Sequence, residues 1–174
     1  MTGRSLIALL LGIALPISAD TLEGKVTRAL DGEILVVKKG KLTQAVRLLG
    51  VDAPDKGQPY YHEARKSLSK LAKKKWVTVE WYRRDDECKA KQPAECPLLG
   101  RVLFDGTDIN LEQLKRGFGW HHQAHLREQS TPDRTQYMEA EEKARQKRLG
   151  LWRQKKPMAP WEFRRLLSSV SRGQ

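Results

Sequence analysis

Three short segments of the chain carry two arginines and three acids whose chemistry suits a phosphodiester bond. These residues are Glu33, Arg47, Asp52, Asp55 and Arg101. A phosphate under attack by water gains negative charge, and two guanidiniums can hold its oxygens by paired hydrogen bonds. Carboxylates can bind a hard divalent cation, and a further carboxylate can orient or deprotonate the water. The set therefore predicts phosphodiester hydrolysis.

The spacing of these residues sets a structural condition. Arg47 and Asp52 are five residues apart, so an unbroken strand would point them to opposite faces. Gly50 permits a bulge, or the strand ends near Val51, and either arrangement lets both side chains reach one site. Two other interpretations stay open. Arg47 can pair with Asp52 or another acid, and Arg101 can be an ordinary cation of an edge strand.

Three histidines close in sequence form a second candidate cluster. His121 and His125 have the i, i+4 spacing of metal ligands on a helix, with His122 between them. No glutamate adjoins the first histidine, as a zinc-protease motif would require. We interpret them as a surface or nucleotide-side cluster. The five tryptophans are interpreted as core or docking residues.

Charge points to a polyanionic partner. The 174 residues suit one domain with short extensions and carry a formal charge of +12, with a pI near 9.9. Such a balance attracts polyanions, and nucleic acid is the expected partner. The alternative is that the positive charge serves solubility alone. Nothing in the sequence indicates an obligate protein partner, so we expect a monomer.

The N-terminus has the pattern of a signal peptide. An apolar run from Leu6 to Ile17 follows Arg4, and the small residue Ala19 comes two positions after the run. This run is too short to span a bilayer as a helix of about 20 residues. We expect cleavage after Ala19, export to the periplasm or medium, and no stable membrane association afterwards. An uncleaved anchor is the alternative.

The cysteine pattern agrees with export. Cys88 and Cys96 are the only cysteines, and two nearby cysteines in an exported chain usually form a disulfide. A metal site is disfavoured because no CxxC spacing or neighbouring histidine accompanies them.

Hydrophobic periodicity predicts the elements that must position these residues. Alternating apolar residues predict five strands, at 22–28, 34–38, 42–51, 76–83 and 100–104. Helical spacing and capping residues predict helices at about 60–73, from 110, at 131–149 and at 161–170. Asp31-Gly32 is a two-residue turn signal, Asn110 and Thr131 are expected helix caps, and Gly117 a helix end.

The order of these elements predicts the fold class. Five short strands with a helix between the third and fourth indicate an α+β chain, mainly a five-stranded OB-fold-like barrel with about three helices packed on it. We divide the chain into a signal peptide (1–19), this domain (20–152), and a basic linker with a short C-terminal helix (153–174).

Three motifs resemble the staphylococcal-nuclease-like (thermonuclease) family. They are Leu30-Asp31-Gly32-Glu33, the segment from Val46 to Tyr60 (VRLLGVDAPDKGQPY), and Gly100-Arg101. The resemblance runs from about Val26 to Trp152, and the tail Pro160-Trp161-Glu162-Phe163-Arg164 resembles an extension of bacterial members. It implies a Ca²⁺-dependent nuclease that cuts DNA and RNA with little sequence specificity.

The resemblance also implies a role for each matching residue. Glu33, Asp52 and the Ala53 carbonyl match calcium ligands, Asp55 matches the general base, and Arg47 and Arg101 match the phosphate arginines. Four positions depart from the family pattern: Glu33 for aspartate, Ile34 for threonine, Asp55 for glutamate and Leu99 for tyrosine. These departures favour the alternative of a nucleic-acid-binding OB module with weak or lost catalysis. A protein-interaction domain is the third alternative.

Overall fold

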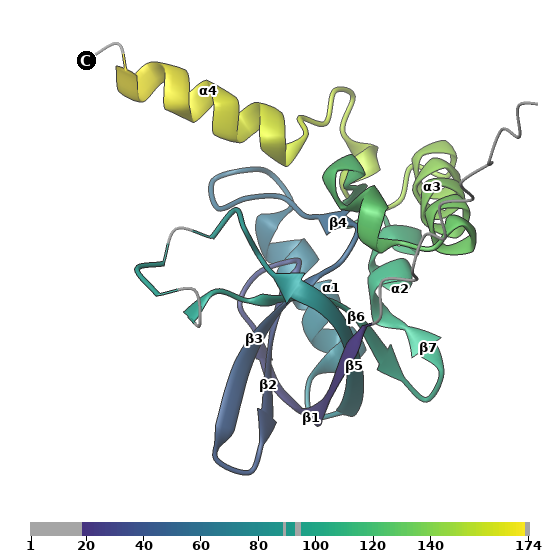
Figure 1. Ribbon diagram of the computed structural model, residues 1–174. Helices are drawn as coiled ribbons and strands as arrows, with labels where there is room; N and C mark the ends of the chain where they lie inside the picture. The colour runs from purple at the N-terminus through teal and green to yellow at the C-terminus, as the bar shows by residue number, and fades with distance from the viewer. Residues whose placement is uncertain (1–18, 89, 93–94, 173–174) are drawn as a thin grey trace, which may run out of the picture.

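Five strands close into a barrel in the computed structural model, which describes residues 19–88, 90–92 and 95–172. The barrel strands are β1 (Asp20–Ala29), β2 (Ile34–Lys39), β3 (Leu42–Leu48), β5 (Trp76–Arg84) and β6 (Leu98–Phe104). They pair antiparallel in the order β3-β2-β1-β5-β6, and a parallel pairing of β3 with β6 closes the ring. The predicted α+β class and five-stranded barrel are confirmed (Figure 1).

The interior is apolar because alternate strand residues face inward. Val26, Leu35, Val46, Val79 and Val102 come from all five strands, and each is completely buried. β7 (Thr107–Asp108) extends the sheet beside β6, while β4 (Val51–Asp52) pairs with β8 (Trp120–His121) outside the barrel.

Helices cover the barrel and extend beyond it. They are α1 (Tyr61–Ala72), α2 (Ile109–Lys115), α3 (Thr131–Gln146) and α4 (Pro160–Arg172), with 3₁₀ turns at Gln123–Glu128 and Gly150–Arg153. α2 packs against both α1 and α3, whereas α4 projects away from the barrel (Figure 1). In the described part of the chain, no helix is long and apolar enough to cross a membrane.

The structure corrects several predicted boundaries. The third strand stops at Leu48 instead of residue 51, because Gly50 takes a positive φ of 74° that breaks the ladder. The Asp31-Gly32 turn is longer than two residues, and the Asp31 carboxylate closes it by accepting hydrogen bonds from the amides of Glu33 and Ile34.

The helix caps also differ from prediction by one or two positions. Asp108 caps α2 by accepting from the Leu111 amide at 3.0 Å, and Asn110 is instead buried inside the helix. Ser130, not Thr131, caps α3, which ends at Gln146 and not at residue 149. Gly117 has the predicted positive φ, 72°.

The predicted signal peptide lies outside the described residues except for Ala19.

Candidate active site

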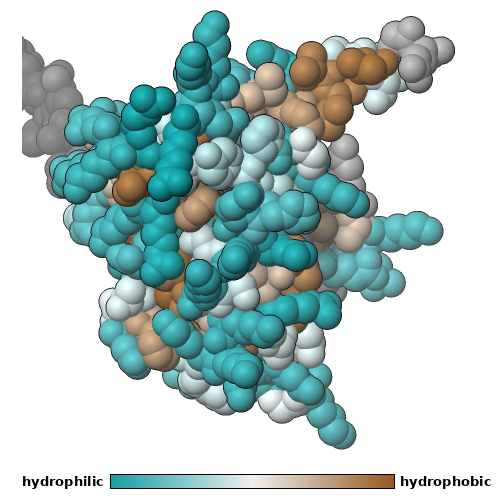
Figure 2. Space-filling model, turned by 180° about the vertical axis from the view of Figure 1, so that it is seen from behind, coloured by the Kyte–Doolittle hydropathy of each residue, from teal (hydrophilic) through white to brown (hydrophobic). Residues whose placement is uncertain are grey.

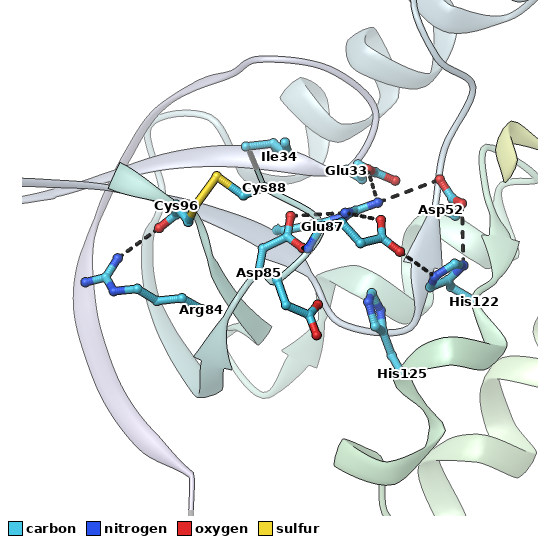
Figure 3. Close-up of polar contacts among 12 residues, drawn as sticks. Glu33, Ile34, Asp52, Arg84, Asp85, Glu87, Cys88, Cys96, His122 and His125 are labelled. Atoms are coloured by element: carbon cyan, nitrogen blue, oxygen red, sulfur yellow. Dashed lines mark hydrogen bonds and ion pairs between the residues drawn. A yellow bond between two sulfur atoms is a disulfide. The ribbon is translucent and has the colours of Figure 1, made fainter. Parts of the chain in front are cut away.

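Arg47 is the centre of a buried cluster of acids. Its guanidinium contacts Glu33 Oε1 at 3.0 Å, Asp85 Oδ2 at 3.0 Å and Glu87 Oε2 at 2.9 Å, and Asp52 Oδ1 at 3.9 Å. Only 6% of the Arg47 side chain is exposed. Figure 3 shows the four acids converging on one point, with Asp85 and Glu87 on one segment and Glu33 and Asp52 on two others. The interpretation that Arg47 pairs with acids is therefore correct.

A break in the chain after β3 brings these residues together. Gly50 redirects the backbone between Leu48 and Val51, so Arg47 and Asp52 meet although they are five residues apart. Glu33 is held by two contacts, the Arg47 ion pair and a 2.7 Å hydrogen bond from the Ala53 amide to its Oε2. The predicted condition for a shared site is met.

Asp85 and Glu87 are site residues that the sequence analysis missed. They follow β5 directly and precede Cys88, which forms the predicted disulfide with Cys96 (Figure 3). The Asp85 amide donates to the Pro97 carbonyl at 2.8 Å, so the base of the disulfide loop fixes their position. The run of three acids at residues 85–87 was the available signal.

Arg164 is a third missed residue, and it comes from α4, near the other end of the chain. Its Nη2 lies 2.8 Å from Asp52 Oδ2, and its Nη1 lies 3.2 Å from Asp52 Oδ1 and 3.0 Å from Asp55 Oδ2. The guanidinium therefore holds Asp52 by both oxygens and bridges it to Asp55.

Arg101 does not join this cluster. Leu99 lies opposite Arg47 in the β3–β6 ladder and is fully buried, and Arg101 is two residues further along β6. Its guanidinium pairs instead with Asp108, the last residue of β7, at 2.8 Å and with Asp133 of α3 at 3.6 Å. Arg101 therefore links β6 by ion pairs to the end of β7 and to α3.

The three histidines are buried, so their interpretation as a surface cluster is wrong. His121 Nε2 lies 2.9 Å from Gln129 Oε1, and His125 Nδ1 accepts the Gly50 amide at 3.2 Å. His122 does belong to the site: its ring nitrogens lie 3.4 Å from an Asp52 oxygen and 3.6 Å from a Glu87 oxygen. Burial lowers its pKa despite these two acids.

The electrostatics of the cluster favour a further cation. Among the described residues, five carboxylates meet two guanidiniums there, those of Arg47 and Arg164. Burial raises the pKa of Glu33 well above its usual range, although the Arg47 charge opposes this effect. Burial also raises the pKa of Asp55, against the pull of Arg164. A divalent cation would relieve the repulsion among these acids.

The donors suit a hard cation such as Ca²⁺. Carboxylates of Glu33, Asp52 and Asp55 and the carbonyl of Ala53 supply oxygen, the ligand atom that Ca²⁺ prefers. Among the described residues, no group of three or more acid, histidine or cysteine side chains is arranged to hold a metal ion. Asp52 and Asp55 nevertheless share one cation already, because Arg164 Nη1 lies 3.2 Å from Asp52 Oδ1 and 3.0 Å from Asp55 Oδ2.

Comparison with known proteins agrees with this geometry. Residues 45–154 match the family described as "Staphylococcal nuclease homologue". A "Micrococcal nuclease" of Shigella flexneri is 32% identical over 161 residues, covering 91% of this chain and 88% of that protein. An "Uncharacterized endonuclease" of Escherichia coli is 29% identical over 150 residues, covering 86% of this chain and 89% of its own length.

Plant relatives are longer than this chain. A "Probable staphylococcal-like nuclease" of Oryza sativa subsp. japonica is 32% identical over 134 residues, and the match covers 77% of this chain but 35% of the plant protein. The chain belongs to the staphylococcal nuclease family.

Proposed function

We propose that this protein is a calcium-dependent nuclease that hydrolyses phosphodiester bonds of DNA or RNA with little sequence specificity. One observation carries the proposal: Asp52 and Asp55 share a single cation beside the buried Arg47 cluster. The family match and the relatives named as nucleases support the reaction class.

The positions of the side chains assign each of them a different role. Glu33, Asp52 and the Ala53 carbonyl would hold the calcium ion, which when bound supplies a Lewis acid and offsets phosphate charge. Arg47 keeps Glu33 and Asp52 in place through its ion pairs. This role differs from the predicted one, because Arg47 is already engaged by acids on several sides.

Asp55 is the candidate that would orient or deprotonate water. Its side chain is 34% exposed, while that of Asp52 is completely buried. The raised pKa of Asp55 makes its carboxylate a stronger base than an ordinary aspartate. An accessible carboxylate beside the cation ligands therefore suits proton transfer from water.

A basic groove supports a polyanionic substrate. It is formed by α1 and the end of β1, and its polar lining contains no acid. The lining cations are Arg28, Arg65, Lys66, Lys70 and Lys73. Ala29 also lines the groove, and the loop bearing Glu33 begins at the next residue. Phosphate contacts along such a surface would bind without reading sequence.

The second candidate is a nucleic-acid-binding module without efficient catalysis. The placement of Arg101 favours it, because the structure takes one predicted phosphate-binding guanidinium away from the site. A cleavage assay separates the candidates. With calcium, single- and double-stranded DNA and RNA should be shortened, and a chelator should stop the reaction. Binding of nucleic acid without cleavage would support the second candidate, the nucleic-acid-binding module.

We also propose export, with mature protein beginning at Asp20 and acting as a monomer outside the cytoplasm. The Cys88–Cys96 disulfide supports an oxidising compartment. Intact-mass measurement of the exported chain tests the cleavage site and the disulfide together.

A further inference from the structure

We propose that Arg164 is a further residue that contacts the substrate phosphate, and that it is released for this contact when a divalent cation binds Asp52 and Asp55. The inference rests on the proposed nuclease function. Both carboxylates are held by the Arg164 guanidinium. A calcium ion and this guanidinium therefore compete for the same oxygens.

Accessibility separates Arg164 from Arg47. The Arg47 side chain is 6% exposed, and both of its terminal nitrogens are engaged by the four acids described above. The Arg164 side chain is 37% exposed and lies at the solvent edge of the cluster. Of these two cluster arginines, Arg164 is the one that an incoming phosphate can reach.

The base of α4 is built to hold Arg164 at the site. The Gln58 side-chain amide donates to the Met158 carbonyl at 2.9 Å, just before the helix begins. The Trp161 ring contacts the rings of His122 and Trp120, with centroids 5.9 Å and 6.4 Å apart. Phe163 packs over Gly57 on the loop that follows Asp55.

The outer part of the helix lacks such contacts. Leu166, Leu167 and Val170 are at least half exposed, and Figure 2 shows apolar atoms gathered along this projecting helix. Arg164 lies in the first turns of α4, which are the turns that pack on the site. The structure therefore holds the backbone of Arg164 at the site. A long arginine side chain can then turn from carboxylate to phosphate without undocking the helix.

The exchange follows from charge. Asp52 and Asp55, if neutralised by a bound cation, would hold Arg164 less strongly. A phosphate beside that cation offers the guanidinium new acceptors in the fork geometry it prefers. The bond to phosphate would strengthen as negative charge develops during hydrolysis, which is the condition for an effect on kcat.

Three variants of the full mature chain test this exchange. Arg164→Gln removes the charge, Arg164→Lys keeps the charge but loses the fork, and Arg165→Gln removes an exposed charge next along α4 as the control. Calcium affinity is measured by calorimetry without nucleic acid. Values of kcat and KM are measured on a single-stranded DNA oligonucleotide, and circular dichroism checks folding.

For Arg164→Gln we expect calcium to bind about fivefold more tightly, because the competing cation is gone. Its kcat should fall about a hundredfold, as for loss of one transition-state donor. Arg164→Lys should bind calcium like wild type and recover only part of kcat, and Arg165→Gln should change neither quantity.

Two results would overturn the inference. If calcium affinity is unchanged in folded Arg164→Gln, Arg164 only forms a structural ion pair with Asp52 and Asp55. If kcat rises in this variant, α4 inhibits the site instead of contributing to catalysis. If the wild-type chain cleaves nothing, the proposed function itself fails, and the calorimetry alone decides whether Arg164 competes with the cation.

Discussion

Arg47 and Glu33 form a 3.0 Å ion pair with both side chains at most 10% exposed. A buried guanidinium of this kind neutralises acids that water cannot reach, and the site and the fold therefore depend on the same residue. Removing one partner of a buried pair is costly because the other charge stays behind.

Arg47→Met should lower the free energy of unfolding by about 3–5 kcal/mol. The reason is that Glu33 and Asp85 lose their buried counter-ion. Urea denaturation measures the change, with Arg83→Met as a matched control. Arg83 is 31% exposed and pairs with Glu128 and Asp86, so its loss should cost about 1 kcal/mol or less. Equal losses for both variants would contradict this account.

Arg101→Gln should leave kcat within about twofold of wild type. Its guanidinium pairs with Asp108 and Asp133 and not with the Arg47 cluster. A modest fall in Tm is expected, because Asp108 loses a partner while keeping its hydrogen bond from Tyr137. Steady-state kinetics on DNA checks the first effect and thermal unfolding the second. A hundredfold loss of kcat would restore the sequence-based role of this arginine.

Replacing both Cys88 and Cys96 by serine should lower the free energy of unfolding by about 2.5 kcal/mol, the loop-closure value for this short loop. Activity should fall as well, since the loop positions Asp85 and Glu87. Denaturation of the oxidised, reduced and double-serine forms gives the comparison. Identical stability of all three would show that the disulfide does not constrain the chain.

His125 should make stability depend on pH. Burial lowers its pKa from 6.5 to about 4, and its Nδ1 accepts the Gly50 amide, so the fold holds the neutral ring. The unfolded chain therefore binds the proton first as pH falls. This contribution is complete above pH 6.5 and is lost as pH falls toward about 4, by as much as about 3 kcal/mol.

Urea denaturation across this window, with His125→Asn and the exposed His62→Asn as control, tests the assignment. The slope should flatten in the first variant alone. An unchanged slope in His125→Asn would assign the pH dependence to other groups.

The barrel could be predicted because its signals are local. Alternating apolar residues mark the strands, and Gly50 marks the break that lets Arg47 reach Asp52. The exact start of α2 was not predicted, because Asp108 caps the helix while the side chain of Asn110, the expected cap, accepts the Val102 amide of β6 instead.

The site was only partly predictable because its missing parts come from distant segments. Asp85 is 38 residues from Arg47, and Arg164 is 112 residues from Asp52. No spacing rule links such positions. The Gly100-Arg101 motif gives the residue type but not the partners of Arg101, which are Asp108 and Asp133.

Calcium-dependent cleavage by Asp52→Asn tests the central claim most directly. Asp52 is fully buried and would be a calcium ligand, whereas Asp86, the control in Asp86→Asn, is 73% exposed and pairs only with Arg83 among the described ion pairs. The account predicts that Asp52→Asn loses about a hundredfold or more in calcium-dependent kcat while still binding DNA, and that Asp86→Asn cleaves like wild type. Undiminished cleavage by Asp52→Asn would contradict the account.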